Sequence, residues 1–358
     1  MFGKFNLANS VLVGMSQAVG VRPERCNKMC HKLSKCNLCE TNCPTGAIKV
    51  GDVGSTVNID WDSCTYCGIC VNICPTGVFN IREMEYENFL KEYLGKITPE
   101  GELKLSCKVS KSDAAMMECL GIIGLPDLLY LYTHGASKII IETPDCTACA
   151  SKYGRDIVTD EIEELKKLST YFEYLDGVQI THEQSSITIK FPKQFPISAP
   201  DPKEEKALKM AQTVDRRGMF GFFRDNAADT LVKSAALLTP QELPTRTTAR
   251  TTKEVPAKRK LLIESLLSCG KLLKDEIRIG AYFYNFEIAT DCVLCKVCTR
   301  MCPTGAFHMS EDDKQILFNP SNCTSCGMCR ISCYYGYIVP SKTLNLKELF
   351  DDLLKFEK

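Results

Sequence analysis

Thiols are crowded into four short stretches of this chain, and these stretches restrict its fold more than any other feature. One of them, CTYCGICVNICPTG, runs from Cys64 to Gly77 and holds four cysteines in eleven residues. Cysteines two or three residues apart rarely reach the distance and orientation that a disulfide requires. Four thiolates on one tight loop do suit a metal centre. Since most of the 22 cysteines lie in such clusters, metal ligation is predicted rather than a disulfide scaffold.

The cysteine pattern repeats, and the repeats set the domain organisation. An N-terminal block contains CNKMCHKLSKCNLCETNCPTGAIKV (26–50) and CTYCGICVNICPTGVFNI (64–81). A C-terminal block contains CVLCKVCTRMCPTGAFHM (292–309) and CTSCGMCRISCYYGYIV (323–339). The segments between the motifs, STVNIDWDSC and KQILFNPSNC, have short or alternating apolar runs that are typical of small strands. Two modules of one design are therefore predicted.

Composition limits the classes of protein to consider. A chain of 358 residues, 44% of them hydrophobic, is typical of a globular protein with about two or three domains. Its 44 basic and 44 acidic residues balance, so no nucleic-acid partner is expected. No apolar stretch reaches the roughly 18 residues of a membrane span. Polar residues interrupt the N-terminal apolar run, which makes a poor signal peptide, and a thiol-rich chain without one is expected to be cytoplasmic.

A different pattern lies between the two blocks. Strands are predicted over residues 102–110 and 137–143, and helices over 125–136 and 160–175, before a final strand or hairpin in GVQITHEQSSITIKF. This alternation predicts a small α/β domain with a parallel sheet. Residues 203–238 are predicted to be helical and 239–260, rich in proline, threonine and basic residues, to be a flexible linker.

Two further helices are predicted near the C-terminus, over residues 261–273 and over an amphipathic segment at 345–358. The last one opens with Asn345 and Glu348 at the spacing of a capping box. The segments 203–238 and 345–358 either dock on a partner protein or pack on the chain's own domains; the pattern leaves both possibilities open.

The spacing C-x2-C-x2-C-x3-C-P resembles that of bacterial ferredoxins with two 4Fe-4S clusters, over residues 26–81 and 288–340. The resemblance implies two α+β ferredoxin-like modules, four 4Fe-4S clusters, and ligands that cross between the two motifs of a module. The implied domains are an N-terminal segment (1–25), a dicluster module (26–95), the α/β domain (96–195), a helical connector with the linker (196–280), a second dicluster module (281–340) and a C-terminal helix (341–358).

The resemblance also implies the ligands of each cluster. The Cys64 site would consist of Cys43, Cys64, Cys67 and Cys70. The Cys292 site would consist of Cys292, Cys295, Cys298 and Cys333. The Cys323 site would consist of Cys302, Cys323, Cys326 and Cys329. Tyr334 replaces the proline that follows the last cysteine of the other motifs. Structural zinc, which takes four thiolates from paired C-x2-C knuckles, is disfavoured by the triple spacing.

The first motif departs from the family's spacing. Its last three positions fall on Cys36, Cys39 and Cys43, but the first falls on Leu33. The remaining site, the Cys36 site, is assigned Cys30, Cys36, Cys39 and Cys74. Cys26 is the alternative to Cys30, which we prefer at this stage because it closes the shorter loop.

Four further cysteines lie in the predicted α/β domain. Cys107 ends its first strand, Cys146 and Cys149 follow the second, and Cys119 lies in a loop. The carboxyl ends of parallel strands meet at one edge of a sheet, so these thiols are expected to converge at a middle site. Their spacing resembles that of the iron–sulfur delta subunit of methyl-viologen-reducing hydrogenase, which implies a 2Fe-2S or 4Fe-4S cluster.

The middle cysteines also have simpler interpretations. In these alternatives Cys146 and Cys149 form a redox-active pair, the four cysteines bind zinc, or they are plain core residues. Cys269, alone in a leucine-rich helix, is expected to be a packing residue.

The sequence contains no dinucleotide-binding or phosphate-binding glycine loop and no zinc-protease motif, and we assign no catalytic residue. The prediction is an electron-transfer subunit that relays single electrons to or from a partner oxidoreductase, with the middle domain coupling its two ends or docking the partner. The resemblance places a molybdopterin oxidoreductase, a hydrogenase or a heterodisulfide reductase among the possible partners. The alternatives are a reductase that acts on a substrate at the middle cluster, and a redox sensor.

Overall fold

The computed structural model describes residues 19–51, 56–81, 86–110, 114–147, 149–196, 253–278 and 280–350. All of them belong to one of the two compact units into which the chain divides, the unit formed by residues 1–196 and 248–358. The predicted helix over 203–238 and most of the predicted linker lie outside the described residues. Within the described part of the chain, every helix is too short or too polar to cross a membrane.

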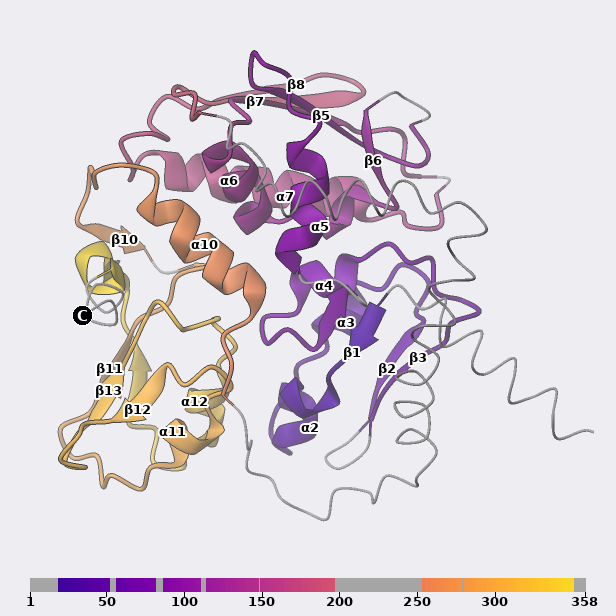
Figure 1. Cartoon of the computed structure of the whole chain (residues 1–358). Helices are drawn as coiled ribbons and strands as arrows, with labels where there is room; N and C mark the ends of the chain where they lie inside the picture. Colours follow the sequence, from indigo (N-terminus) through magenta and orange to yellow (C-terminus); the bar gives the residue numbers. More distant parts are fainter. Residues whose placement is uncertain are drawn as a thin grey trace, which may run out of the picture. The chain divides into compact units, whose positions relative to one another are not determined.

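Two antiparallel strand pairs frame the N-terminal module (Figure 1). Strand β1 (Val19–Val21) pairs with β4 (Phe79–Ile81), and β2 (Ile48–Val50) pairs with β3 (Val57–Ile59). The short helical turns are η1 (Pro23–Arg25), α2 (Asn27–Cys30), α3 (Leu38–Thr41) and α4 (Ile69–Ile73). Because β1 pairs with β4, the module includes Val19–Val21, which precede the predicted boundary at residue 26.

The C-terminal module repeats this arrangement, as the repeated motifs predict. Strand β11 (Phe286–Ile288) pairs with β14 (Ile338–Pro340), and β12 (Phe307–Met309) pairs with β13 (Ile316–Phe318). Its two helices are α11 (Val297–Met301) and α12 (Met328–Ser332). The rings of Phe286, Phe307 and Phe318 pack together with centroids 4.9–5.7 Å apart, which supplies a small core between the strand pairs. Strand β10 (Glu276–Arg278) pairs antiparallel with β15 (Thr343–Asn345) in a separate two-stranded sheet.

The middle domain is built on a five-stranded sheet of order β6-β5-β7-β9-β8. Strands β6 (Ala115–Met117), β5 (Glu102–Cys107) and β7 (Lys138–Glu142) are parallel. Strand β9 (Ser186–Lys190) pairs antiparallel with β7, and β8 (Gln179–His182) pairs antiparallel with β9 in a hairpin. The predicted parallel sheet is therefore a mixed one, because the short connection between β8 and β9 permits only antiparallel pairing.

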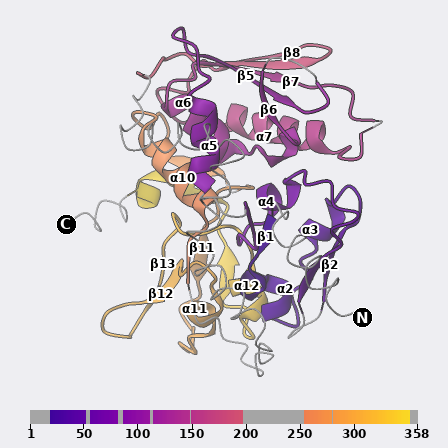
Figure 2. The same ribbon diagram turned by 45° about the vertical axis from the view of Figure 1, so that its right-hand side comes forward.

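Helices cover one face of this sheet. Helices α6 (Leu125–Thr133) and α7 (Gly154–Ser169) lie below the sheet in both views (Figures 1 and 2). Alternate residues of β5 and β7 point into the core between the sheet and these helices, among them Leu103, Leu105, Ile139 and Ile141. Helices α5 (Tyr86–Leu94) and α10 (Ala257–Leu267) pack against α6.

One connecting segment differs from its prediction, whereas the described part of the predicted C-terminal helix agrees with it; residues 351–358 lie outside the described residues. Residues 257–260, predicted to belong to a flexible linker, form the first turn of α10. This segment shows no apolar periodicity, but its basic side chains form hydrogen bonds with other parts of the fold, as described below. Residues 346–350 are helical, and Leu346 and Leu349 are fully buried in the core of the middle domain. The apolar face of these residues therefore packs on the chain itself. Cys269 is also fully buried there, which confirms its packing role.

Candidate iron–sulfur centres

Three of the four cysteine loops share a strained backbone. Tyr66, Leu294 and Ser325, each directly before the second cysteine of its motif, have φ angles of 57°, 51° and 57°. The residues after that cysteine, Gly68, Lys296 and Gly327, also have positive φ. Non-glycine residues rarely adopt this conformation, and such strain gathers at functional sites. In the first motif the equivalent residues are Lys35 and Asn37, and neither has a positive φ; Asn37, which precedes helix α3, has a φ of −137°.

The thiols of the Cys64 site surround one cavity. Cys43, Cys64, Cys67 and Cys70 all line it, together with apolar side chains such as Val19. The sequence-predicted set is thus brought together from both motifs of the N-terminal module. Each thiolate of a cubane binds a different iron, so four sulfurs spread around a cavity fit such a cluster.

Electrostatics distinguish Cys43 from its neighbours. Burial, followed by the adjacent thiols, raises the pKa of Cys70 well above its usual range. Burial acts in the same direction on Cys43, but hydrogen bonds from Thr45 and from nearby backbone N–H groups outweigh it and lower the pKa of that thiol. In three motifs the last cysteine contacts the threonine two residues later. The Sγ–Oγ1 distances are 3.6–3.8 Å in the pairs Cys43–Thr45, Cys74–Thr76 and Cys302–Thr304. Such donors stabilise the thiolate, which is the form that binds metal.

Cys26, the alternative to Cys30, lies with the other cysteines of the Cys36 site. It is buried in a cluster against which the partly buried Cys39 and Cys74 pack. Burial raises the pKa of Cys39 to about 12, and the thiols of Cys74, Cys26 and Cys36 add to the increase. The Sγ atom of Cys30, by contrast, donates to the carbonyl oxygen of Glu24 at 3.3 Å.

The preference for Cys30 rested on loop length, and the structure removes its basis. Residues 27–30 form the one-turn helix α2. A helix advances about 1.5 Å per residue, less than half the advance of extended chain. The four residues from Cys26 to Cys30 therefore advance only about 6 Å along the helix axis, so loop length alone gives little reason to prefer Cys30.

The C-terminal thiols form two groups with the predicted crossing. The pKa of Cys323 is raised to about 12, first by burial and then by the thiols of Cys326 and Cys302. Burial also raises the pKa of Cys298 to about 11, where the adjacent thiols are Cys292, Cys295 and Cys333. The thiols within each group thus interact electrostatically, and the two groups match the ligand sets that the resemblance implies for the Cys323 and Cys292 sites.

The four middle cysteines also line one cavity, at the predicted edge of the sheet. Cys107 is the last residue of β5, and Cys119 begins the turn η2 (Leu120–Ile122). The backbone N–H of Ser151 donates to Sγ of Cys149 at 3.4 Å. A Cβ atom at Gly154 would lie 2.3 Å from Sγ of Cys119, so the start of α7 has no room for a side chain beside this thiol. This gathering of thiols fits an iron–sulfur cluster, as at the Cys64 site.

The middle site adjoins the Cys64 site. Ser151 Oγ donates to Thr65 Oγ1 at 3.0 Å, and a Cβ at Gly68 would lie 2.5 Å from the side chain of Ile122. Burial raises the pKa of Cys119 to about 12, and the thiols that add to the increase include Cys67. Sequence patterns gave no signal for the Ser151–Thr65 contact, because 86 residues separate the partners.

The C-terminal module meets the N-terminal module on another side. Asn27, which is 3% exposed, donates from Nδ2 to the carbonyl oxygen of Cys326 at 3.4 Å. Asn27 directly follows Cys26, so this contact brings the Cys36 and Cys323 sites together. The N-terminal module thus contacts both other domains. The middle domain also contacts the C-terminal module, since Tyr282 Oη donates to Glu161 Oε2 of α7.

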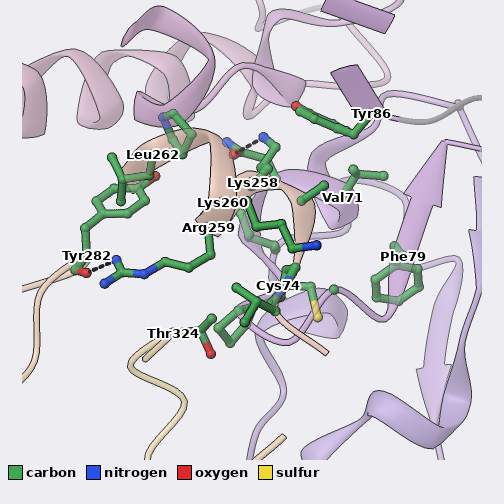
Figure 3. Close-up of a pocket in the computed structure, with 18 of the residues that line it drawn as sticks. Val71, Cys74, Phe79, Tyr86, Lys258, Arg259, Lys260, Leu262, Tyr282 and Thr324 are labelled. Atoms are coloured by element: carbon green, nitrogen blue, oxygen red, sulfur yellow. Dashed lines mark hydrogen bonds between the residues drawn. The ribbon is translucent and has the colours of Figure 1, made fainter. Parts of the chain in front are cut away.

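A large cavity of about 1090 Å³ opens beside Cys74 (Figure 3). Its lining includes Phe79 of β4, Lys258 and Lys260 of α10, and Thr324 of the C-terminal module. The close-up shows Lys258 and Arg259 extending from α10 toward different neighbours (Figure 3).

Among the described residues, no group of three or more His, Cys, Asp or Glu side chains is close enough together to bind a single metal ion. Comparison with known families gives two matches to the 4Fe-4S dicluster domain, over residues 29–78 and 291–337. These ranges contain every cysteine of the repeated motifs apart from Cys26. The chain therefore carries two dicluster domains with four 4Fe-4S clusters in total, and its role is iron–sulfur electron transfer.

Proposed function

We propose that this chain is an electron-transfer subunit with five iron–sulfur centres, which relays single electrons to or from a redox partner protein. The observation that carries the proposal is the gathering of the four middle thiols around one cavity, directly beside the Cys64 site. Bound clusters supply one-electron chemistry, and the protein supplies their ligands, surroundings and spacing. A molybdopterin oxidoreductase, a hydrogenase or a heterodisulfide reductase is the class of partner we propose, and the compartment is the cytoplasm.

The proposed ligands follow the predicted sets with one change. Cys26 takes the place of Cys30 in the Cys36 site, because it is buried with Cys39 and Cys74. The Cys64, Cys292 and Cys323 sites keep their predicted members. The middle site uses Cys107, Cys119, Cys146 and Cys149, which hold a 2Fe-2S or a 4Fe-4S cluster.

The contacts between domains suggest an order for the five sites. The Cys323 loop contacts the residue after Cys26, and the loop of the Cys64 site contacts the middle site. In this order the two sites of the N-terminal module lie between the C-terminal module and the middle site. Short separations favour electron tunnelling, so the middle site exchanges electrons most readily with the Cys64 site.

Iron content gives the first test. The anaerobically reconstituted chain is expected to be brown and to bind about sixteen irons in four cubanes, plus about two to four in the middle site. Iron and acid-labile sulfide assays, with metal analysis of protein from the native host, measure this. Four or five tightly bound zinc ions in place of iron and sulfide would contradict the proposal.

Replacing Cys119 by serine tests the middle site separately. The variant is expected to lose the low-temperature EPR signal of that centre and its two to four irons, while the four cubanes remain. Cys119 is informative because a dithiol that used only Cys146 and Cys149 would not need it. Cys269→Ser is the matched control, since Cys269 is also a buried thiol and belongs to none of the proposed sites. An unchanged spectrum and iron content in Cys119→Ser would refute the middle cluster.

A further inference from the structure

Arg259 is a buried cation with no acidic partner among the described residues. Only 5% of the residue is exposed. Its Nε donates to the carbonyl of Ser321 at 2.7 Å, Nη2 to that of Pro320 at 2.7 Å, and Nη1 to that of Tyr282 at 2.6 Å. Figure 3 shows the guanidinium extended from α10 to Tyr282. Carbonyl dipoles solvate the guanidinium group but supply no net countercharge.

The neighbouring basic residues differ from Arg259 in this respect. Lys258, one residue earlier, donates to Asp127 Oδ2 at 2.9 Å and forms an ion pair with it. Arg25, beside Cys74 in the N-terminal module, lies 3.2 Å from the carboxylate of Glu254. Both of these cations have an acidic partner within the chain, and their charges are largely offset.

The loop that receives Arg259 leads directly into the Cys323 site. Its acceptors at Pro320 and Ser321 precede Cys323 by three and two residues. Arg259 and the thiol of Cys323 also act on each other electrostatically, and both are buried. A buried charge is costly unless an opposite charge lies near. Thiolates that bind a cluster at this site would supply that opposite charge.

We propose that Arg259 is the countercharge of the Cys323 site and raises the reduction potential of the centre held there. The inference rests on the proposed ligand set of that site. Reduction adds one negative charge to the centre, and a fixed positive charge nearby in a poorly solvated interior stabilises the reduced form. Arg259 contacts the loop rather than the centre itself, so its role is electrostatic and positioning.

Arg259→Gln tests this inference because it removes the charge but keeps an amide donor for the carbonyls. In the reconstituted full chain, an EPR-monitored redox titration is expected to show one midpoint shifted to a more negative potential, with the other midpoints unchanged. The shifted signal is assigned by its absence in Cys323→Ser. Arg259→Lys keeps the charge, and its midpoint is expected to stay close to that of the wild type.

Arg330→Gln is the matched control, since Arg330 is an exposed arginine directly after Cys329 of the same site. Water screens its charge, so a much smaller shift is expected. Loss of the centre in Arg259→Gln but not in Arg259→Lys would also support the countercharge. An unmoved midpoint in Arg259→Gln, or the same shift or loss in both Arg259 variants, would overturn it. If Cys323→Ser removes no centre at all, the ligand set fails, and that failure is separate from the role of Arg259.

Discussion

Cys26→Ser is expected to lose one cubane, whereas Cys30→Ser is expected to retain all four. Cys26 is 8% exposed and shares a buried cluster with Cys39 and Cys74. Serine is a poor ligand for iron–sulfur clusters, because the cluster needs a soft thiolate. The expected loss is therefore about four of the sixteen irons of the ferredoxin modules, which is the largest change that a single ligand substitution produces there.

Iron and sulfide assays on the two variants, reconstituted side by side, measure the difference. Cys30→Ser is the matched control, because Cys30 lies four residues away in the same short helical turn and is only partly exposed. Full cluster content in Cys26→Ser together with a loss in Cys30→Ser would restore the ligand preferred from loop length. A loss in both variants would mean that the whole segment 26–30 is needed to shape the site.

The second large effect is expected from Asp127→Ala, which should lower the free energy of unfolding by about 3–5 kcal/mol. Asp127 is fully buried, and its Oδ2 accepts hydrogen bonds from Lys258 at 2.9 Å, from Tyr86 at 3.0 Å and from the N–H of Gly124 at 2.7 Å. Lys258 also donates to Asn72 Oδ1 at 2.7 Å. The substitution leaves a largely buried ammonium without its countercharge in the place where α4, α5, α6 and α10 meet.

Denaturant unfolding of anaerobic protein, followed by circular dichroism, is the measurement for Asp127→Ala. Glu164→Ala is the control, because its ion pair with Lys167 lies at the surface and should contribute less than about 1 kcal/mol. The double variant Asp127→Ala with Lys258→Met should recover part of the loss, since no uncompensated charge remains. A decrease for Asp127→Ala no larger than that of the surface control would refute the role of this pair.

Local features of the chain were predictable from the sequence. The ligands of a ferredoxin module lie on short loops, and the resemblance of their spacing to that of two-cluster ferredoxins implied the Cys64, Cys292 and Cys323 sets. The strands and helices of the middle domain follow from apolar periodicity, and the parallel order of β5 and β7 then brings Cys107 close to Cys146 and Cys149. In each case the determining interactions lie within a few residues or within one sheet.

Only the tertiary structure decided the features that depend on distant partners. The burial of Cys26 beside Cys39 and Cys74 is the basis for proposing it, instead of Cys30, as the fourth ligand of the Cys36 site. Lys258 and Arg259 look like linker residues by composition, yet they are held by Asp127 and by the carbonyls before Cys323. The contact between Thr65 and Ser151 joins two loops far apart in the chain. Periodicity and spacing report local preferences, whereas the burial of a charge or a thiol depends on which other parts of the chain surround it.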